Sequence, residues 1–126
     1  MQTIFAIAAG GATGAVLRHF LNSSVAHWLG TGFPWGIFIA NILGSFVMGC
    51  LITGFALVYE PPQVVRAFLA VGLLGAFTTF STFSLDAVTL FERGNILAAA
   101  LYVGGSVTLA IGALFAGMTL IRLVAA

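Results

Sequence analysis

Hydrophobic residues fill four long segments of the chain, and short polar stretches separate them. The segments run from about Thr3 to Leu21, from Pro34-Trp35 to about Tyr59, from about Val64 to Phe91, and from about Ile96 to Leu123. Each is close to the roughly 20 residues that a helix needs to cross a bilayer. The polar connections are Asn22–Phe33, Glu60–Gln63 and Arg93–Asn95. The pattern predicts an all-α membrane protein, with four transmembrane helices in a single domain, residues 1–126.

The composition supports a membrane location. The chain is 61% hydrophobic and only 6% charged, whereas about 25% of the residues of a soluble domain are charged. It has no lysine and no basic run, so nucleic acid is not an expected partner. It also has no metal-ligand cluster and no organised catalytic triad, so we do not expect an enzyme.

The four arginines are evenly divided between the two sides of the predicted membrane. Four spans put both termini on one side, where Arg66 and Arg122 also lie, while Arg18 and Arg93 lie on the other. Orientation normally follows an excess of Lys and Arg on the cytoplasmic side. Two interpretations stay open. Either the chain inserts both ways up and forms antiparallel pairs, or one arginine is buried and a weak fixed orientation remains.

The third segment contains an unusual run, Thr78–Ser84 (TTFSTFS), which follows Gly72, Gly75 and Ala76. Lipid offers no hydrogen bonds to backbone groups, so a glycine-loosened, hydroxyl-rich helix must face protein or an aqueous path. Phe80 and Phe83 are neighbours on the helix surface, and the positive edges of their rings can meet an anion. The alternative is plain packing, with each hydroxyl bonded to a carbonyl one turn earlier.

Other polar residues could extend such a path. Thr79, Thr82 and Asp86 share a neighbouring face of the third segment, and Asp86 is the only acid well inside a span. An intramembrane acid is a functional hypothesis by default, and we expect Asp86 to organise hydroxyls or arginines. Tyr102 and Ser106, four residues apart on the fourth segment, either continue a hydrogen-bonding track or make helix contacts.

Two features of the first two segments have competing interpretations. Asn41, Ser45 and Gly49 share one helix face, where Asn41 either joins helices or donates to a permeating anion. Arg18 either extends its side chain to the headgroups or forms an electropositive vestibule. Gly10 and Gly14 are spaced for close helix packing.

These residues resemble the Fluc (CrcB) fluoride channels of bacteria. The matching stretches are Gly10–Arg18 (GGATGAVLR), Pro34–Gly36 with Asn41 and Gly44, Gly75–Ser84 (GAFTTFSTFS) and Glu92–Asn95 (ERGN). The hydroxyl and phenylalanine motif in so short a four-span chain is the most specific of them. The chain departs from the family pattern at Ile37, commonly threonine, at Ala76, commonly glycine, and at Asp86, usually glutamate.

The resemblance implies an antiparallel homodimer in the bacterial cytoplasmic membrane, with a break in the third helix and two pores that export fluoride passively. It implies a structural sodium ion at the dimer centre, held by the carbonyls of Gly75 and Thr78. The expected pore residues are Asn41, Ser81, Thr82, Tyr102 and Ser106, with the rings of Phe80 and Phe83. Arg18 is expected in a vestibule, and Thr79 and Asp86 are expected to support the polar track.

Two rival classes fit parts of the pattern. A small proton-coupled or multidrug transporter has the same length and number of spans, and would rely on Asp86, because the first span holds no glutamate. A non-conducting helical assembly would use the hydroxyls only to join helices.

Overall fold

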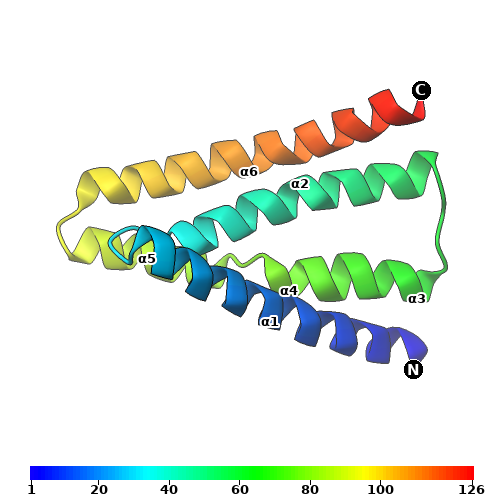
Figure 1. Ribbon diagram of the computed structural model, residues 1–126, viewed down its shortest axis with the longest axis horizontal. Helices are drawn as coiled ribbons and strands as arrows, with labels where there is room; N and C mark the ends of the chain where they lie inside the picture. Colours follow the sequence, from blue (N-terminus) through cyan, green and yellow to red (C-terminus); the bar gives the residue numbers. More distant parts are fainter.

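Four long helices lie alongside one another in the computed structural model, which describes all 126 residues. They are α1 (Gln2–Leu29), α2 (Trp35–Leu57), a composite third helix (Gln63–Glu92) and α6 (Ile96–Ala125). Each is long and apolar enough to cross a membrane. Both termini lie at one end of the bundle (Figure 1). The all-helical, four-span prediction is confirmed.

The third span is made of several pieces. It begins as α3 (Gln63–Arg66), widens into the π-helix η1 (Ala67–Leu74), returns to α-helix in α4 (Gly75–Phe77), and resumes after a gap as α5 (Ser81–Glu92). The gap begins at Thr78, which is extended, with φ −88° and ψ 156°. The predicted break is therefore present, although Gly75 and Ala76 are themselves helical and the chain departs from helix only after them.

The first helix is longer than the sequence predicts. We expected a connection from Asn22, but α1 continues through Asn22, Ser23 and Ser24 to Leu29. Polar residues do not end a helix by themselves, because its backbone hydrogen bonds continue past the hydrocarbon boundary. The helix ends at Gly30, whose φ of 83° suits a residue without a side chain.

Glycines bring the first half of the third span against α1. A β-carbon at Gly10 would fall on the carbonyl oxygen of Phe68, and one at Gly14 would fall on the carbonyl of Leu73. In the opposite direction, a β-carbon at Gly72 would lie 2.7 Å from the carbonyl oxygen of Ile7. The backbones of the two helices are therefore in direct contact, which confirms close packing through Gly10 and Gly14.

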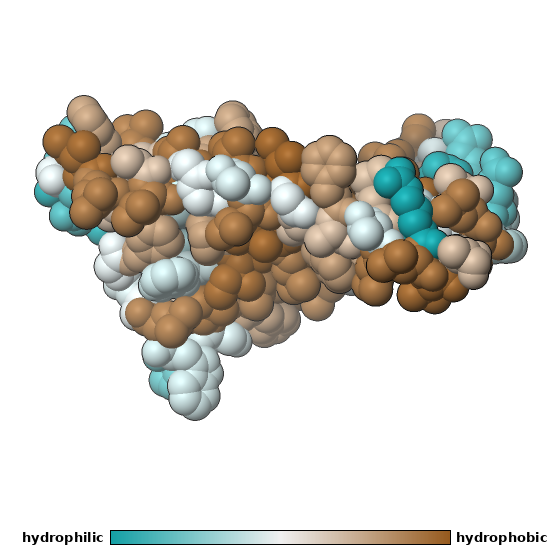
Figure 2. Space-filling model, turned by 90° about the horizontal axis from the view of Figure 1, so that it is seen from above, coloured by the Kyte–Doolittle hydropathy of each residue, from teal (hydrophilic) through white to brown (hydrophobic).

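A second pair of glycines brings α2 against α6. A β-carbon at Gly49 would meet the carbonyl of Leu114, and one at Gly117 would meet that of Phe46. The outer surface of the bundle is mostly apolar, and hydrophilic residues gather towards its two ends (Figure 2). At one of these ends the guanidinium of Arg66 lies 4.9 Å from the ring centre of Phe55, an attraction between a cation and a ring face.

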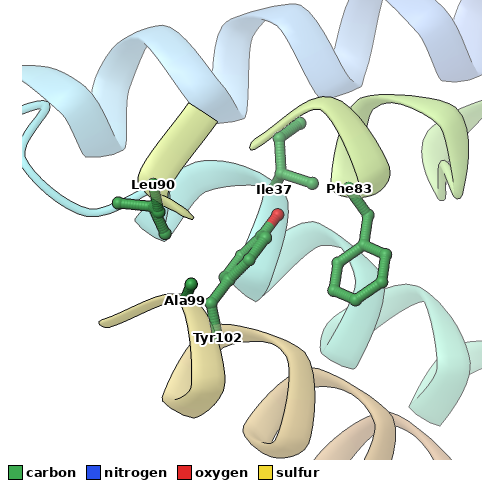
Figure 3. Packing of buried hydrophobic residues seen from close by; sticks show 5 residues of the cluster. All are labelled: Ile37, Phe83, Leu90, Ala99 and Tyr102. Carbon is green, nitrogen blue, oxygen red and sulfur yellow. The ribbon is translucent and has the colours of Figure 1, made fainter. Parts of the chain in front are cut away.

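An aromatic core forms where α5 and α6 meet α2. Tyr102 of α6 is fully buried, and it extends between Leu90 and Phe83 of α5 (Figure 3). Its ring centre lies 5.1 Å from that of Phe83 and 5.4 Å from that of Phe33. Ile37 of α2 belongs to the same cluster. The core therefore anchors α5, the part of the third span that follows the break.

Candidate functional site

A groove of about 390 Å³ opens beside the break in the third span. It is lined from three spans: α2 contributes Asn41 and Ser45, the third span contributes the residues around the break, and α6 contributes Ser106 and apolar neighbours. No charged residue lines it. Of the predicted site residues, the groove brings together Asn41, Gly75, Thr78, Thr79, Phe80, Phe83 and Ser106.

Asn41 binds the backbone of the break with both ends of its amide. The amide nitrogen of Asn41 donates to the carbonyl oxygen of Thr79 at 3.1 Å, and the backbone N–H of Thr79 donates to the amide oxygen of Asn41 at 2.8 Å. The interpretation of Asn41 as a residue that joins helices is therefore correct. Asn41 can also donate to a permeating anion, because a side-chain amide has two N–H donors and only one of them is used in this contact.

Most hydroxyls of the Thr78–Ser84 run are satisfied locally. Those of Thr78 and Ser84 donate to carbonyls one turn earlier, at 3.0 Å and 2.9 Å. The hydroxyl oxygen of Thr79 accepts the backbone N–H of Thr82 at 3.2 Å and so caps the start of α5. Ser81 is exposed, and its hydroxyl lies 3.4 Å from that of Thr79. These hydroxyls mainly stabilise the two edges of the break.

Ser106 differs from these residues. Its side chain is only 4% exposed, and its hydroxyl oxygen is buried without a hydrogen-bond partner. A buried polar group without a partner costs free energy, commonly 1–3 kcal/mol as an order of magnitude. Ser106 also lines the groove, so this buried, unpartnered hydroxyl belongs to a residue of the groove wall.

The two phenylalanines of the motif have different surroundings. Phe80 is 77% exposed, whereas Phe83 is 7% exposed and packs against Tyr102 in the aromatic core. Their ring centres are 5.5 Å apart, with an angle of 43° between the ring planes. Both line the groove, so one fixed ring and one accessible ring meet at its wall.

Two of the remaining predicted residues lie at a second hollow of about 230 Å³, next to the loop between α1 and α2, whereas Ser81 lines neither space. The hollow is lined by Thr82 and Asp86, while Thr79 lies in the groove instead, so the predicted polar face is divided. The carboxylate of Asp86 accepts the hydroxyl of Tyr102 at 3.2 Å, which agrees with an organising role for Asp86. Tyr102 itself does not line the groove.

Asn22 is a polar residue of this second hollow that our sequence reasoning missed. Its side chain lies against α2 at Gly36, where a β-carbon would collide with it. The sequence signal was the small residue at position 36, but we had assigned Asn22 to a loop. Arg18 is half-buried and lines neither the groove nor the hollow.

The break leaves several backbone carbonyls without hydrogen bonds, among them those of Gly75 and Thr78. No backbone or side-chain donor reaches the carbonyl oxygen of Gly75 or of Thr78, because the N–H of Thr79 is taken by Asn41 and that of Thr82 by the Thr79 hydroxyl. Gly75 and Thr78 both line the groove. Unpaired carbonyl oxygens are suitable ligands for a hard cation. These two residues therefore fit the sodium ion that the resemblance implies.

A bundle of four membrane-spanning helices, broken beside an uncharged polar groove, belongs to the class of small multi-pass membrane channels and transporters. The chain is a member of the CrcB family: residues 5–118 match the model of the CrcB-like protein, Camphor Resistance (CrcB) family.

Curated relatives are similar over nearly the whole chain. A protein of Rhodospirillum centenum is 53% identical over 122 residues, which are 97% of each chain. One of Rhodopseudomonas palustris is 51% identical over 96% of this chain and 98% of the relative. One of Nitrobacter winogradskyi is 47% identical over 96% of each. All three relatives are named fluoride-specific ion channel FluC.

Proposed function

We propose that the protein is a fluoride-selective ion channel that lets fluoride leave the cell passively across the cytoplasmic membrane. The observation that carries the proposal is the groove beside the break, which is uncharged and contains the buried, unpartnered hydroxyl of Ser106. The names of the similar proteins support the same function. A channel of this kind is not an enzyme.

Fluoride is small, strongly hydrated and a strong hydrogen-bond acceptor, so a path for it must replace water with donors. The Ser106 hydroxyl and the second N–H of the Asn41 amide are two such donors in the groove. The edges of the Phe80 and Phe83 rings add a weakly positive wall. Conduction requires binding that is weak enough for release, and a groove without a basic residue meets this condition.

The groove also supports assembly from two copies. It is open on one side, with the Asn41 amide only partly buried and Gly75 exposed. Polar backbone and side-chain groups cannot face lipid at this depth, so a second copy is the natural cover. The even division of the arginines supports an antiparallel pair with two pores. The carbonyls of Gly75 and Thr78 would hold a sodium ion between the copies, and its charge would satisfy both pairs of oxygens.

The two rival functions account for less of the structure. A proton-coupled transporter built on Asp86 would need this acid in the solute path, but Asp86 lies outside the groove and accepts the Tyr102 hydroxyl. A non-conducting assembly accounts for the Asn41 contact and for the locally bonded hydroxyls. It gives no reason for a buried, unpaired hydroxyl at Ser106.

The function is tested by fluoride efflux from proteoliposomes that have no proton gradient. We expect rapid efflux once a potassium ionophore releases the membrane potential, and much slower efflux of chloride. Asp86→Asn keeps an oxygen that can accept the Tyr102 hydroxyl, so it should retain passive efflux. Efflux that requires a proton gradient, and that Asp86→Asn abolishes, would indicate the transporter. No efflux at all would indicate the non-conducting assembly.

Dual topology has its own test. A tag at the C-terminus should be accessible from both sides of the membrane in a population of cells, because each side receives two arginines. A tag accessible from one side only, in every molecule, would contradict the antiparallel pair and leave the channel function untouched.

A further inference from the structure

We infer that Asn41 is a positioning residue for the Thr78 carbonyl, and that it links the anion groove to the cation ligands of the break. The inference rests on the proposed function, because it takes the Gly75 and Thr78 carbonyls as the place where sodium binds. It assigns the Asn41 amide a second task, separate from any contact that it makes with the anion.

The geometry of the peptide bond carries the inference. In a trans peptide the C=O and the N–H point in opposite directions, and the chain has no cis peptide bonds. The N–H of Thr79 points at the amide oxygen of Asn41, 2.8 Å away. The carbonyl of Thr78 belongs to the same peptide unit, so it must point away from α2. The Asn41 oxygen thereby sets the direction of a carbonyl that it does not touch.

The next peptide unit is fixed in the same way. The Asn41 nitrogen donates to the Thr79 carbonyl, so the N–H of Phe80 also points away from α2. Two successive peptide units are therefore held by one side chain, at a place where the helical hydrogen-bond ladder is interrupted. No other side chain bonds to the Thr79 backbone, and the contact joins residues 38 positions apart.

Asn41 thus maintains a conformation that is costly without a ligand. It keeps the Thr79 N–H from returning to the Gly75 carbonyl, which stays unpaired on the open groove. The Thr78 carbonyl, whose direction Asn41 sets, stays unpaired because the Thr79 hydroxyl takes the Thr82 N–H. Unpaired carbonyls within a membrane are unfavourable unless a donor or a cation satisfies them. An asparagine that holds them in this state prepares two oxygen ligands in advance.

Three variants separate this positioning role from donation to the anion. Asn41→Asp keeps an acceptor oxygen for the Thr79 N–H, which orients the Thr78 carbonyl, but loses both the N–H that bonds to the Thr79 carbonyl and the N–H left for the anion. Asn41→Leu has a similar volume and no acceptor, with Asn41→Ala as a substitute if the leucine variant is not recovered as a folded dimer. Ser45→Ala is the matched control, because Ser45 is on the same helix and lines the same groove without bonding to the break.

The measurement is the sodium concentration that gives half of the maximal thermal stabilisation of the purified dimer, with N-methyl-D-glucamine replacing sodium. We expect Asn41→Leu to raise this concentration by about tenfold or more, the scale of one lost hydrogen bond to a group that binds charge. Asn41→Asp and Ser45→Ala should stay within about threefold of the unmodified protein. Fluoride efflux, measured in parallel, should be lost in Asn41→Asp although its response to sodium remains.

The outcomes distinguish the inference from the function on which it rests. If the unmodified protein is not stabilised by sodium, the proposed cation site is wrong, whatever the variants do. If the unmodified protein responds and Asn41→Leu responds at the same concentration, Asn41 does not position the Thr78 carbonyl. The inference is also overturned if Asn41→Asp is shifted as far as Asn41→Leu, because an acceptor oxygen would then not be what matters.

Discussion

The two halves of the third span are held in place by different kinds of contact. Before the break, η1 meets α1 backbone to backbone, through Gly10, Gly14 and Gly72. After the break, α5 is anchored by side chains, with Phe83 and Leu90 packed around Tyr102 of α6. Backbone contact fixes a position with little tolerance, whereas side-chain packing adapts. The difference indicates that the first half tolerates no added atom at its contact with α1, whereas the second half, which brings Phe83 to the groove, depends on side-chain packing.

Gly14→Ala should have the largest effect, because it adds an atom to the backbone contact between α1 and η1. The added β-carbon would fall on the carbonyl of Leu73, and backbone atoms cannot move aside as a flexible side chain can. We expect a destabilisation of at least about 1–3 kcal/mol and loss of the dimer peak in size-exclusion chromatography. Gly112→Ala is the control, since nothing lies within 4 Å of its β-carbon position. A normal dimer yield for Gly14→Ala would show that α1 and η1 separate more easily than we infer.

Phe80→Ile and Phe83→Ile come next, because they remove ring edges from the groove wall while keeping apolar bulk. If the edges hold the anion, fluoride efflux should fall by about fivefold in each, the factor that corresponds to about 1 kcal/mol of lost ring interaction. Phe80 is 77% exposed and Phe83 is 7% exposed, so only Phe83→Ile should also lower thermal stability, by less than about 1.5 kcal/mol.

Phe80→Ile therefore serves as the control for folding, because it should lower efflux without lowering thermal stability. Near-normal efflux in both variants, with the dimer intact, would mean that the rings only pack.

Ser106→Ala should have the smallest effect on efflux, and it should change stability and efflux in opposite directions. Removing a buried hydroxyl that has no protein partner should raise stability, by on the order of 1 kcal/mol. If that hydroxyl serves the anion, efflux should nevertheless fall several-fold. Thr119→Ala is the comparison variant on the same helix. The Thr119 hydroxyl donates to the Phe115 carbonyl at a distance of 2.8 Å, and Thr119 does not line the groove. Unchanged efflux in Ser106→Ala would remove this hydroxyl from the proposed path.

The helices were predictable from the sequence, since continuous apolar runs of membrane length are a strong local signal. The end of α1 was not, because Asn22, Ser23 and Ser24 are typical of a connection and yet continue the helix to Leu29. The widening of the third span into a π-helix between Ala67 and Leu74 lies within a continuous apolar run, a pattern that does not distinguish it from an α-helix.

The break shows why local signals place a feature only approximately. Gly75 and Ala76 drew the prediction to their own position, but the chain leaves the helix at Thr78. It does so where Asn41, far away in the sequence, supplies the hydrogen bonds that the helix gives up. The bond between Tyr102 and Asp86, and the different burial of Phe80 and Phe83, also depend on contacts between separate helices. The residue types near the site could be predicted, but the partner of each could not.

The division of the arginines along the bundle has a consequence for the direction of transport. Two lie towards the end that carries the termini and two towards the other. The arginine count therefore does not assign either end to the cytoplasm. An assembly of two copies in opposite orientations would present the same surface to both compartments. The two oppositely directed pores of such an assembly together would show no net rectification. The membrane potential and the fluoride concentrations alone would decide which way the ion moves, at about 2.3 kcal/mol per charge for each 100 mV.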